Sequence, residues 1–170
     1  KKKILKKIKK IKKTIKKKKK KSQFIIINNF TKRSVKNSIN KILHLGDYYE
    51  NRTSINFKAL NHNRRIFLDQ LRDRGIHMDI IPGNHDVYYK NTNQLNSLKE
   101  LLGHYMNEVN IVEEPTVMNY DGLKCALLPW INSENTDKIT RFVNTCKADV
   151  LGAHLELTGF EMQAGVPCHD

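Results

Sequence analysis

Two short apolar segments, residues 41–45 and 78–81, each lead into a glycine that is followed by a side chain able to hold a metal. That side chain is Asp47 after the first segment and Asn84 after the second. The interval between them is long enough for a strand, a helix and a return to a neighbouring parallel strand, which is a βαβ unit. Ligands of open α/β proteins bind at the edge where parallel strands end. We therefore predict that Asp47 and Asn84 face one pocket.

The second segment continues as Pro82-Gly83-Asn84-His85-Asp86. Gly83 allows a sharp turn, so the residues after it can point into a common pocket. The amide oxygen of Asn84 suits Mn²⁺ or Mg²⁺, and His85 can exchange a proton near neutral pH. Asp86 can hold the imidazole in the useful tautomer. The alternative interpretation of these five residues alone is a turn with a capping asparagine and a surface histidine.

A third segment that resembles a strand, residues 149–154, ends in another potential ligand, His154. A single histidine in this setting is more often a core or surface residue than a ligand. Together with Asp47 and Asn84, however, it makes three strand ends of the same kind. This coincidence favours metal binding by all three side chains.

These segments resemble, in order and spacing, three signature blocks of the calcineurin-like metallophosphoesterase superfamily. Further similarity points to the SbcD-type nuclease branch and, within it, to the catalytic subunits of tailed-phage recombination endonucleases. It lies in four segments, residues 51–55, 86–91, 128–130 and 154–160. The resemblance covers residues 41–170.

The resemblance implies an α/β fold, a metallophosphoesterase-type β-sandwich flanked by helices. It also implies a phosphodiesterase that uses two metals, normally Mn²⁺ with Mg²⁺ as an alternative. Asp47 would bridge the two metals, and Asn84 and His154 would complete the protein ligands of the second one. His85 would lie near the scissile phosphate, where it stabilises the transition state or protonates the leaving group, and Asp86 would orient it.

The same resemblance implies a nuclease subunit that acts on DNA ends in recombination and repair. Its partners would be DNA, an SMC-like coiled-coil ATPase subunit of the SbcC type and a second copy of the intact protein. A phage-encoded member would work in the host cytoplasm. Two other functions stay open. One is a phosphatase of the same superfamily that is not a nuclease, because one fold hosts many activities. The other is a nucleic-acid-binding fragment that uses its basic tail.

Two signature blocks of the family are not recognisable. The family opens with a strand that ends in Asp-x-His, whereas the corresponding segment here, residues 24–29, is followed by Phe30. The closing His-x-His block would lie beyond Asp170. We therefore expect a fold that is incomplete at both ends and a chain that binds Mn²⁺ weakly and is inactive alone. Two milder departures are Glu50, where Asp is usual, and Ala153, where Gly is usual.

Charge divides the chain into two parts. Residues 1–41 hold 19 of the 31 Lys and Arg and none of the 17 acidic residues, so the net charge of +14 comes from this end. We expect residues 1–40 to be a lysine-rich, low-complexity tail that is disordered or no part of the domain, and residues 41–170 to be a partial metallophosphoesterase domain. An alternative for the tail is a basic amphipathic helix on an anionic membrane or on nucleic acid.

Secondary structure is predicted from apolar periodicity. A helix with Leu60, Ile66, Phe67 and Leu71 on its inner face should end at Gly75. The remaining predicted elements are a short helix near residues 95–102, strands at 109–112, 116–120 and 123–128, a hairpin turn at Asp121-Gly122, and a helix whose Ile139, Phe142 and Val143 face inward.

Three cysteines without a C-x-x-C pair indicate neither a disulfide framework nor a zinc site, and they fit a reducing cytoplasm. Cys125 is predicted to be a core residue. No apolar stretch is long enough to span a membrane, and residues 24–27 are too short for a signal peptide.

Overall fold

The computed structural model describes residues 40–155, 161–163 and 166–167. The predicted lysine-rich tail lies outside this range apart from Asn40, so the division at residue 40 stays a prediction. In chain order the elements are β1 Lys41–His44, α3 Phe57–Asn63, the π-helical turn η1 Arg64–Leu68, α4 Asp69–Arg74, β2 His77–Ile80, α5 Ser97–Leu102, η2 Gly103–Tyr105, β3 Val109–Ile111, β4 Thr116–Tyr120, β5 Leu123–Leu128, α6 Thr136–Thr145, β6 Val150–Ala153, β7 Glu161–Gln163 and β8 Val166–Pro167.

The first sheet has the order β1-β2-β3, and all its strands are parallel. Helical residues between Phe57 and Arg74 connect β1 to β2, as the predicted βαβ unit requires. Residues 41–44 pair in register with residues 77–80, so the two strands end at the same edge of the sheet. The chain segments that follow them, which carry Asp47 and Asn84, consequently start side by side.

The connecting helix contains one turn of π-helix in its middle. It begins at the cap Asn56, whose side chain accepts hydrogen bonds from two backbone amides, and it ends at Gly75 in the left-handed conformation, as predicted. In a regular helix, Ile66 would point about 100° away from Phe67 and still farther from Leu60 and Leu71. Ile66 is largely exposed, so its predicted place on the inner face is wrong, whereas Leu60 and Leu71 are buried.

The second sheet has the order β4-β5-β6. β4 and β5 form the predicted hairpin, in which Asp121 and Gly122 both adopt positive φ. Helix α6 then returns the chain so that β6 runs parallel to β5. Ile139 and Val143 of this helix and Cys125 of β5 are buried, as predicted. His154 follows the end of β6.

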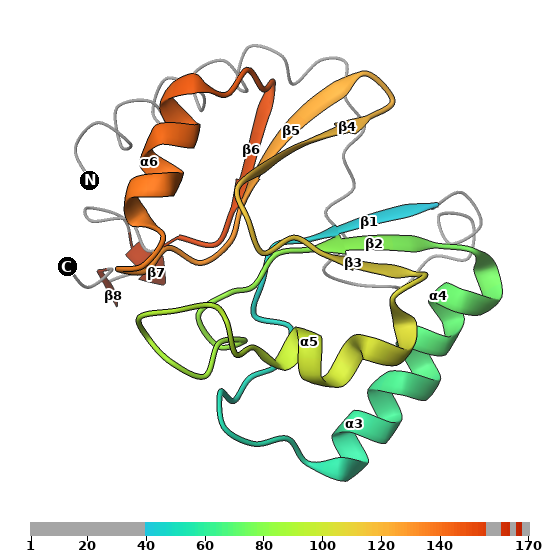
Figure 1. The fold of residues 1–170 in the computed structure, drawn as a ribbon. Helices are drawn as coiled ribbons and strands as arrows, with labels where there is room; N and C mark the ends of the chain where they lie inside the picture. Colours follow the sequence, from blue (N-terminus) through green and yellow to red (C-terminus); the bar gives the residue numbers. More distant parts are fainter. Residues whose placement is uncertain (1–39, 156–160, 164–165, 168–170) are drawn as a thin grey trace.

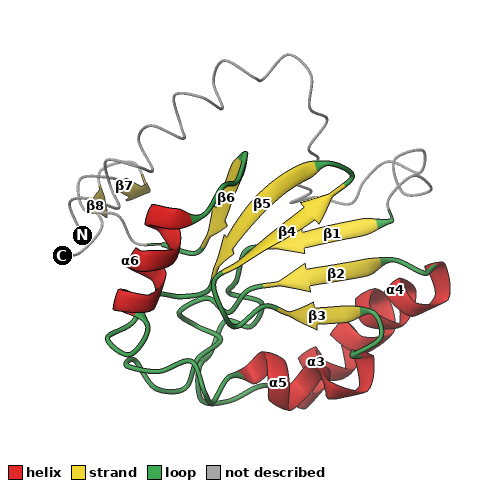
Figure 2. Ribbon diagram, turned by 45° about the horizontal axis from the view of Figure 1, so that its top comes forward, coloured by secondary structure: helices red, strands yellow, loops and turns green. Residues whose placement is uncertain are grey.

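The hydrophobic core has three parts, which define the layers of the molecule. One packs α4 and α5 against the first sheet, the next lies between the two sheets, and the last packs α6 against β5 and β6. Figures 1 and 2 show the resulting arrangement, with the two sheets between α3, α4 and α5 on one side and α6 on the other. The α/β class is therefore confirmed. The assignment to the metallophosphoesterase sandwich stays a prediction.

Asp79, a fully buried carboxylate in the middle of β2, fastens the two sheets together. It accepts hydrogen bonds from the Asn110 side chain at 2.8 Å and from the Tyr120 hydroxyl at 2.8 Å, and Lys41 lies 2.9 Å away. The pKa of Tyr120 is raised far above its usual value, mainly because its hydroxyl is buried and secondarily because it donates a hydrogen bond to Asp79. A buried charge is tolerated here because each of its oxygens has a partner.

Among the described residues, no helix is long and apolar enough to cross a membrane.

Candidate functional site

The turns after β1 and β2 approach each other so closely that both need glycine. A Cβ on Gly46 would lie 2.7 Å from the backbone of Gly83, and a Cβ on Gly83 would clash with the carboxylate and backbone of Asp47. Gly46 also has a φ of +86°, and Asp47, a residue with a side chain, has a φ of +53°. Such strained conformations occur at functional sites. Here the close approach sets the Asp47 carboxylate directly against the turn that carries Asn84.

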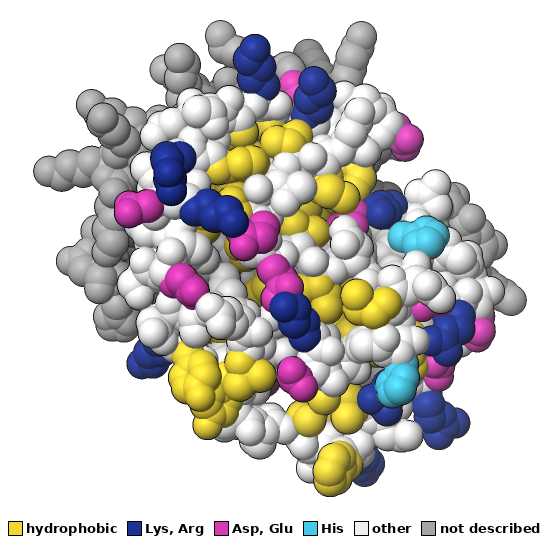
Figure 3. Space-filling view, in the orientation of Figure 1, with side chains coloured by type: hydrophobic (Ala, Val, Ile, Leu, Met, Phe, Trp, Pro, Cys, Tyr) yellow, Lys and Arg dark blue, Asp and Glu magenta, His cyan; other side chains and the backbone are white. Residues whose placement is uncertain are grey.

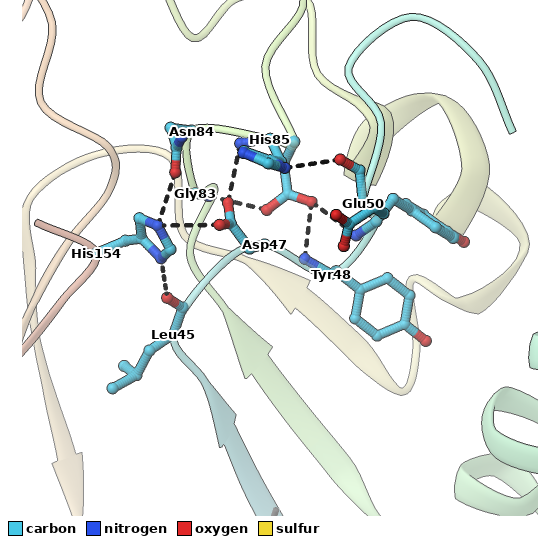
Figure 4. A network of polar contacts seen from close by, with 10 residues as sticks. Leu45, Asp47, Tyr48, Glu50, Gly83, Asn84, His85 and His154 are labelled. Carbon is cyan, nitrogen blue, oxygen red and sulfur yellow. Dashed lines mark hydrogen bonds and ion pairs between the residues drawn. The ribbon is translucent and has the colours of Figure 1, made fainter. Parts of the chain in front are cut away.

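Asp47, Asn84 and His154 converge on one point from three strand ends (Figure 4). The Nε2 atom of His154 lies 2.8 Å from Asn84 Oδ1 and 3.2 Å from Asp47 Oδ2. The other ring nitrogen, Nδ1, lies 2.9 Å from the carbonyl oxygen of Leu45. The predicted metal ligands are thus brought together, although they are separated by up to 107 positions in the sequence.

The hydrogen-bonding chemistry of this trio favours a cation between its members. A carbonyl oxygen only accepts, so the contact with Leu45 places a proton on Nδ1 of His154. In the neutral ring Nε2 then presents a lone pair toward the oxygens of Asp47 and Asn84, which are acceptors as well. Three acceptors at such distances repel one another unless a proton or a metal lies between them. A backbone carbonyl on the other ring nitrogen is also the usual support of a histidine that binds a metal.

No group of three or more His, Cys, Asp or Glu side chains in the described part of the chain is able to hold a metal. The trio has two members of that kind, Asp47 and His154, and its third donor is the amide oxygen of Asn84. This donor set fits one hard or borderline cation such as Mn²⁺.

His85 is fixed beside the trio by its backbone and by its ring. Its backbone N–H donates to Asp47 Oδ1 at 2.9 Å, and its ring Nδ1 lies 2.7 Å from the carbonyl oxygen of Glu50. The Glu50 carbonyl therefore places the proton on Nδ1, which leaves Nε2 to face other groups. Both oxygens of the Asp47 carboxylate are thereby positioned, one by His85 and one opposite His154.

Asp86 does not orient the His85 ring, contrary to the sequence prediction. Its carboxylate is completely buried and accepts three backbone hydrogen bonds, from Tyr48 at 2.9 Å, Tyr49 at 3.2 Å and Gly83 at 2.9 Å. Burial raises the pKa of Asp86, and the three amides oppose this shift. Asp86 thus ties the turn after β1 to the turn after β2, and the ring of His85 takes its partner from Glu50 instead.

The structure gives contacts at the site to two residues for which the sequence analysis proposed no role. Tyr48 donates its hydroxyl to the Asn63 side chain at 3.0 Å, which joins the Asp47 turn to the helix just before its π-helical segment. The backbone amide of Trp130 donates to the Pro82 carbonyl at 2.8 Å, and its ring lies 6.0 Å from that of His154. The sequence shows the aromatic pair Tyr48-Tyr49 directly after Asp47. Its spacing does not show that Tyr48 hydrogen-bonds to Asn63.

His44 is a further unpredicted neighbour of the site. Its Nδ1 atom is buried without a hydrogen-bond partner, and burial lowers its pKa. Its position at the end of β1, three residues before Asp47, is the sequence signal that could have pointed to it.

Comparison with known proteins gives an informative match. No protein-family model matches the chain. The chain is 37% identical over 136 residues to "Exonuclease subunit 1" of Enterobacteria phage T4, and the match covers 80% of the chain and 40% of that protein. The chain therefore spans about two-fifths of the length of this curated relative. The predicted resemblance to a phage nuclease subunit is confirmed.

Proposed function

Because the chain is homologous to part of Exonuclease subunit 1 of phage T4, we propose that it is the ligand-bearing part of a metal-dependent DNA nuclease subunit. The reaction is hydrolysis of phosphodiester bonds at DNA ends during recombination and repair. The metal is Mn²⁺, with Mg²⁺ as the alternative. The observation that carries this proposal is the meeting of three acceptor atoms, from Asp47, Asn84 and His154, at the ends of three strands.

Asp47, Asn84 and His154 would hold the metal, and each has a support that suits this task. Asp47 has one oxygen fixed by the backbone of His85, so its other oxygen stays directed toward His154. His154 is held in one tautomer by Leu45. When bound, such a metal neutralises phosphate oxygens and makes its bound water more acidic.

His85 is the residue proposed to act on the substrate itself. Its Nδ1 atom is occupied by the Glu50 carbonyl, so Nε2 is the atom that faces a phosphate or a leaving oxygen. In the imidazolium form this N–H stabilises the charge on the phosphate and donates a proton to the leaving group. Asp86, which was predicted to be catalytic, keeps a proposed indirect role, because it holds the two turns that carry Asp47 and His85.

Three donors do not suffice for two metals held close together. The family's opening Asp-x-His and closing His-x-His blocks would supply the remaining ligands, and neither is recognisable in this sequence. We therefore propose that the chain by itself binds one Mn²⁺ weakly and does not cleave DNA. The full activity belongs to a protein of the length of the phage T4 relative.

The proposed partners follow from the same homology. They are DNA, an SMC-like coiled-coil ATPase subunit of the SbcC type, and a second copy of the intact subunit. The proposed location is the host cytoplasm.

Metal binding tests the site directly. We expect added Mn²⁺ to broaden the NMR signals of the His154 ring and the Asn84 amide in the wild-type chain, because a paramagnetic ion acts on nearby nuclei. Asp47→Ala, Asn84→Ala and His154→Ala should each lower the Mn²⁺ affinity by more than the roughly 10- to 100-fold that the loss of a supporting partner costs. The affinity is taken from the Mn²⁺ concentration at which the remaining signal broadens, which is the His154 ring in Asn84→Ala and the Asn84 amide in His154→Ala. His85→Ala should keep it, and Asp73→Asn on the exposed face of α4 is the control. Loss of binding in His85→Ala together with retention in Asn84→Ala would show that these roles are assigned wrongly.

Activity is tested in a version extended to the length of the phage T4 relative, with the family's missing blocks restored. We expect Mn²⁺-dependent cleavage of linear duplex DNA, with His85→Ala slowed in the chemical step. Hydrolysis of nitrophenyl phosphate without cleavage of DNA would instead identify a phosphatase.

A further inference from the structure

Two neighbouring tyrosines on the loop between β2 and α5 expose their rings to solvent. Tyr88 is 46% exposed and Tyr89 is 51% exposed. The two rings pack edge to face, with centroids 4.8 Å apart and planes at 80°. Tyr88 comes three positions after His85 in the sequence, so the chain length between them keeps their Cα atoms within about 11 Å of each other.

The backbone of the loop that carries these rings is held in place by burial and by backbone hydrogen bonds. Val87, the residue before them, is completely buried and forms a β-bridge with Asn96. The backbone amide of Tyr88 donates to the Leu95 carbonyl at 3.0 Å, and that of Ser97 donates to the Asp86 carbonyl at 2.8 Å. Both ends of the loop are therefore closed by backbone hydrogen bonds. Aromatic groups positioned in advance lose little conformational entropy when they bind a ligand.

Asn93, in the middle of the loop, is also held by hydrogen bonds. The side chain of Asn93 donates to the carbonyl oxygen of Trp130 at 2.9 Å and accepts from the Asn132 side chain at 2.8 Å. These bonds join the loop to the segment between β5 and α6. The exposed tyrosines thus lie on a loop that hydrogen bonds hold at both ends and in its middle.

The charge of the loop differs from that of the surrounding domain. Residues 87–97 include one charged residue, Lys90, and no Asp or Glu, whereas residues 42–170 contain 12 basic and 17 acidic residues. Two carboxylates from other segments reach the far part of the loop, where Glu134 accepts from Gln94 at 2.7 Å and Glu113 accepts from Asn96 at 2.8 Å. Lys90 is the one charged residue that adjoins the two tyrosines in the sequence, and it is the group that attracts a phosphate. Figure 3 shows a group of hydrophobic side chains at the lower left of the surface, in the area where Figure 1 places this loop.

We propose that Tyr88 and Tyr89 form a stacking platform for a base of a single-stranded DNA end, with Lys90 beside the adjacent phosphate. The inference rests on the proposed nuclease function and extends it to the form of the substrate. A base exposes its face for stacking only when its strand is unpaired at that point, and stacking on an aromatic ring tolerates any sequence. The perpendicular rings of Tyr88 and Tyr89 do not both stack on parallel neighbouring bases, so one base occupies the platform.

Binding of short oligonucleotides tests the platform without any catalysis. Fluorescence anisotropy is measured with the full chain in EDTA, so that neither metal binding nor cleavage contributes. Two labelled single strands of equal length are compared, one with its bases and one with abasic sites at its end. The lysine-rich segment 1–40 is present in every variant and contributes equally to each measurement.

We expect Tyr88→Ala or Tyr89→Ala to weaken binding of the strand with bases by about tenfold, a typical effect of losing one stacked base. The same substitution should leave binding of the abasic strand unchanged. Tyr88→Phe and Tyr89→Phe keep the rings and should bind both strands as the wild type does. Phe57→Ala is the matched control, because that ring is 85% exposed on α3, outside the proposed platform.

An equal loss on both strands, or no loss on either, would overturn the platform. A change in oligomeric state caused by Tyr88→Ala or Tyr89→Ala, without an effect on DNA, would do the same and would indicate a protein contact. The nuclease assay on the extended version separates this result from a failure of the proposed function. Cleavage of DNA by the wild type, combined with unchanged strand binding by the alanine variants, refutes the platform alone.

Discussion

Replacing Asp86 by Asn should destabilise the fold, because Asp86 serves the two turns of the site and does not serve the His85 ring. The carboxylate accepts two backbone amides on Oδ1 and one on Oδ2. An asparagine side chain that keeps its oxygen toward Tyr48 and Tyr49 turns its NH₂ group against the Gly83 amide, so one buried donor loses its partner and meets another donor.

The size of the effect follows from this count of lost bonds. An unsatisfied buried amide costs about 1–3 kcal/mol, so we expect Asp86→Asn to lower the free energy of unfolding by that amount. Asp86→Ala leaves all three amides without an acceptor. For this variant we expect a loss of about 3–5 kcal/mol, which is at the upper end for a single substitution.

Urea unfolding followed by tryptophan fluorescence is the assay. The chain has one tryptophan, Trp130, and its ring lies 6.0 Å from that of His154, so the signal reports on the site region. Asp73→Asn, which makes the same chemical change on an exposed position of α4, is the control and should stay within about 0.5 kcal/mol of the wild type.

The opposite result would restore the prediction made from sequence. If Asp86→Asn unfolds at the urea concentration of the wild type and, in the extended version, slows DNA cleavage as much as His85→Ala does, then Asp86 acts by orienting the His85 ring. The role as a tie between the two turns would then be refuted.

Two further predictions concern the packing that supports the site. Gly83→Ala should lower the stability by about 1–3 kcal/mol and abolish the Mn²⁺-dependent NMR broadening, because its Cβ would displace Asp47. Gly103→Ala, where a Cβ would meet nothing within 4 Å, should be neutral or slightly stabilising, and equal behaviour of the two variants would contradict this account. Tyr120 has a pKa that is raised in the folded chain, so the unfolded chain ionises first and stability should fall as the pH rises above about 10. Thermal unfolding between pH 8 and about 11 should show this fall, and Tyr120→Phe should reduce it. Burial also raises the pKa values of Tyr48, Tyr49 and Tyr105, so part of the fall should remain in this variant, whereas an undiminished fall would contradict the role of Tyr120.

The sequence by itself predicted which side chains meet in the candidate site, and it predicted much of the local structure. Asp47, Asn84 and His154 were predictable because each follows a strand, and parallel strands end at a common edge. The Asp121-Gly122 turn and the end of the helix at Gly75 were also predictable, since each depends on the backbone preferences of one or two residues. These features are local, or they follow from a repeated local pattern.

Tertiary structure alone decided which groups the polar side chains meet. Asp86 binds the amides of Tyr48 and Tyr49, 38 and 37 positions away, and His85 binds the Glu50 carbonyl, 35 positions away. Backbone donors and acceptors are present at nearly every residue, so a sequence does not show which of them a folded turn brings within reach. The elements and their order come from periodicity, whereas the contacts between distant turns come from the way those elements pack.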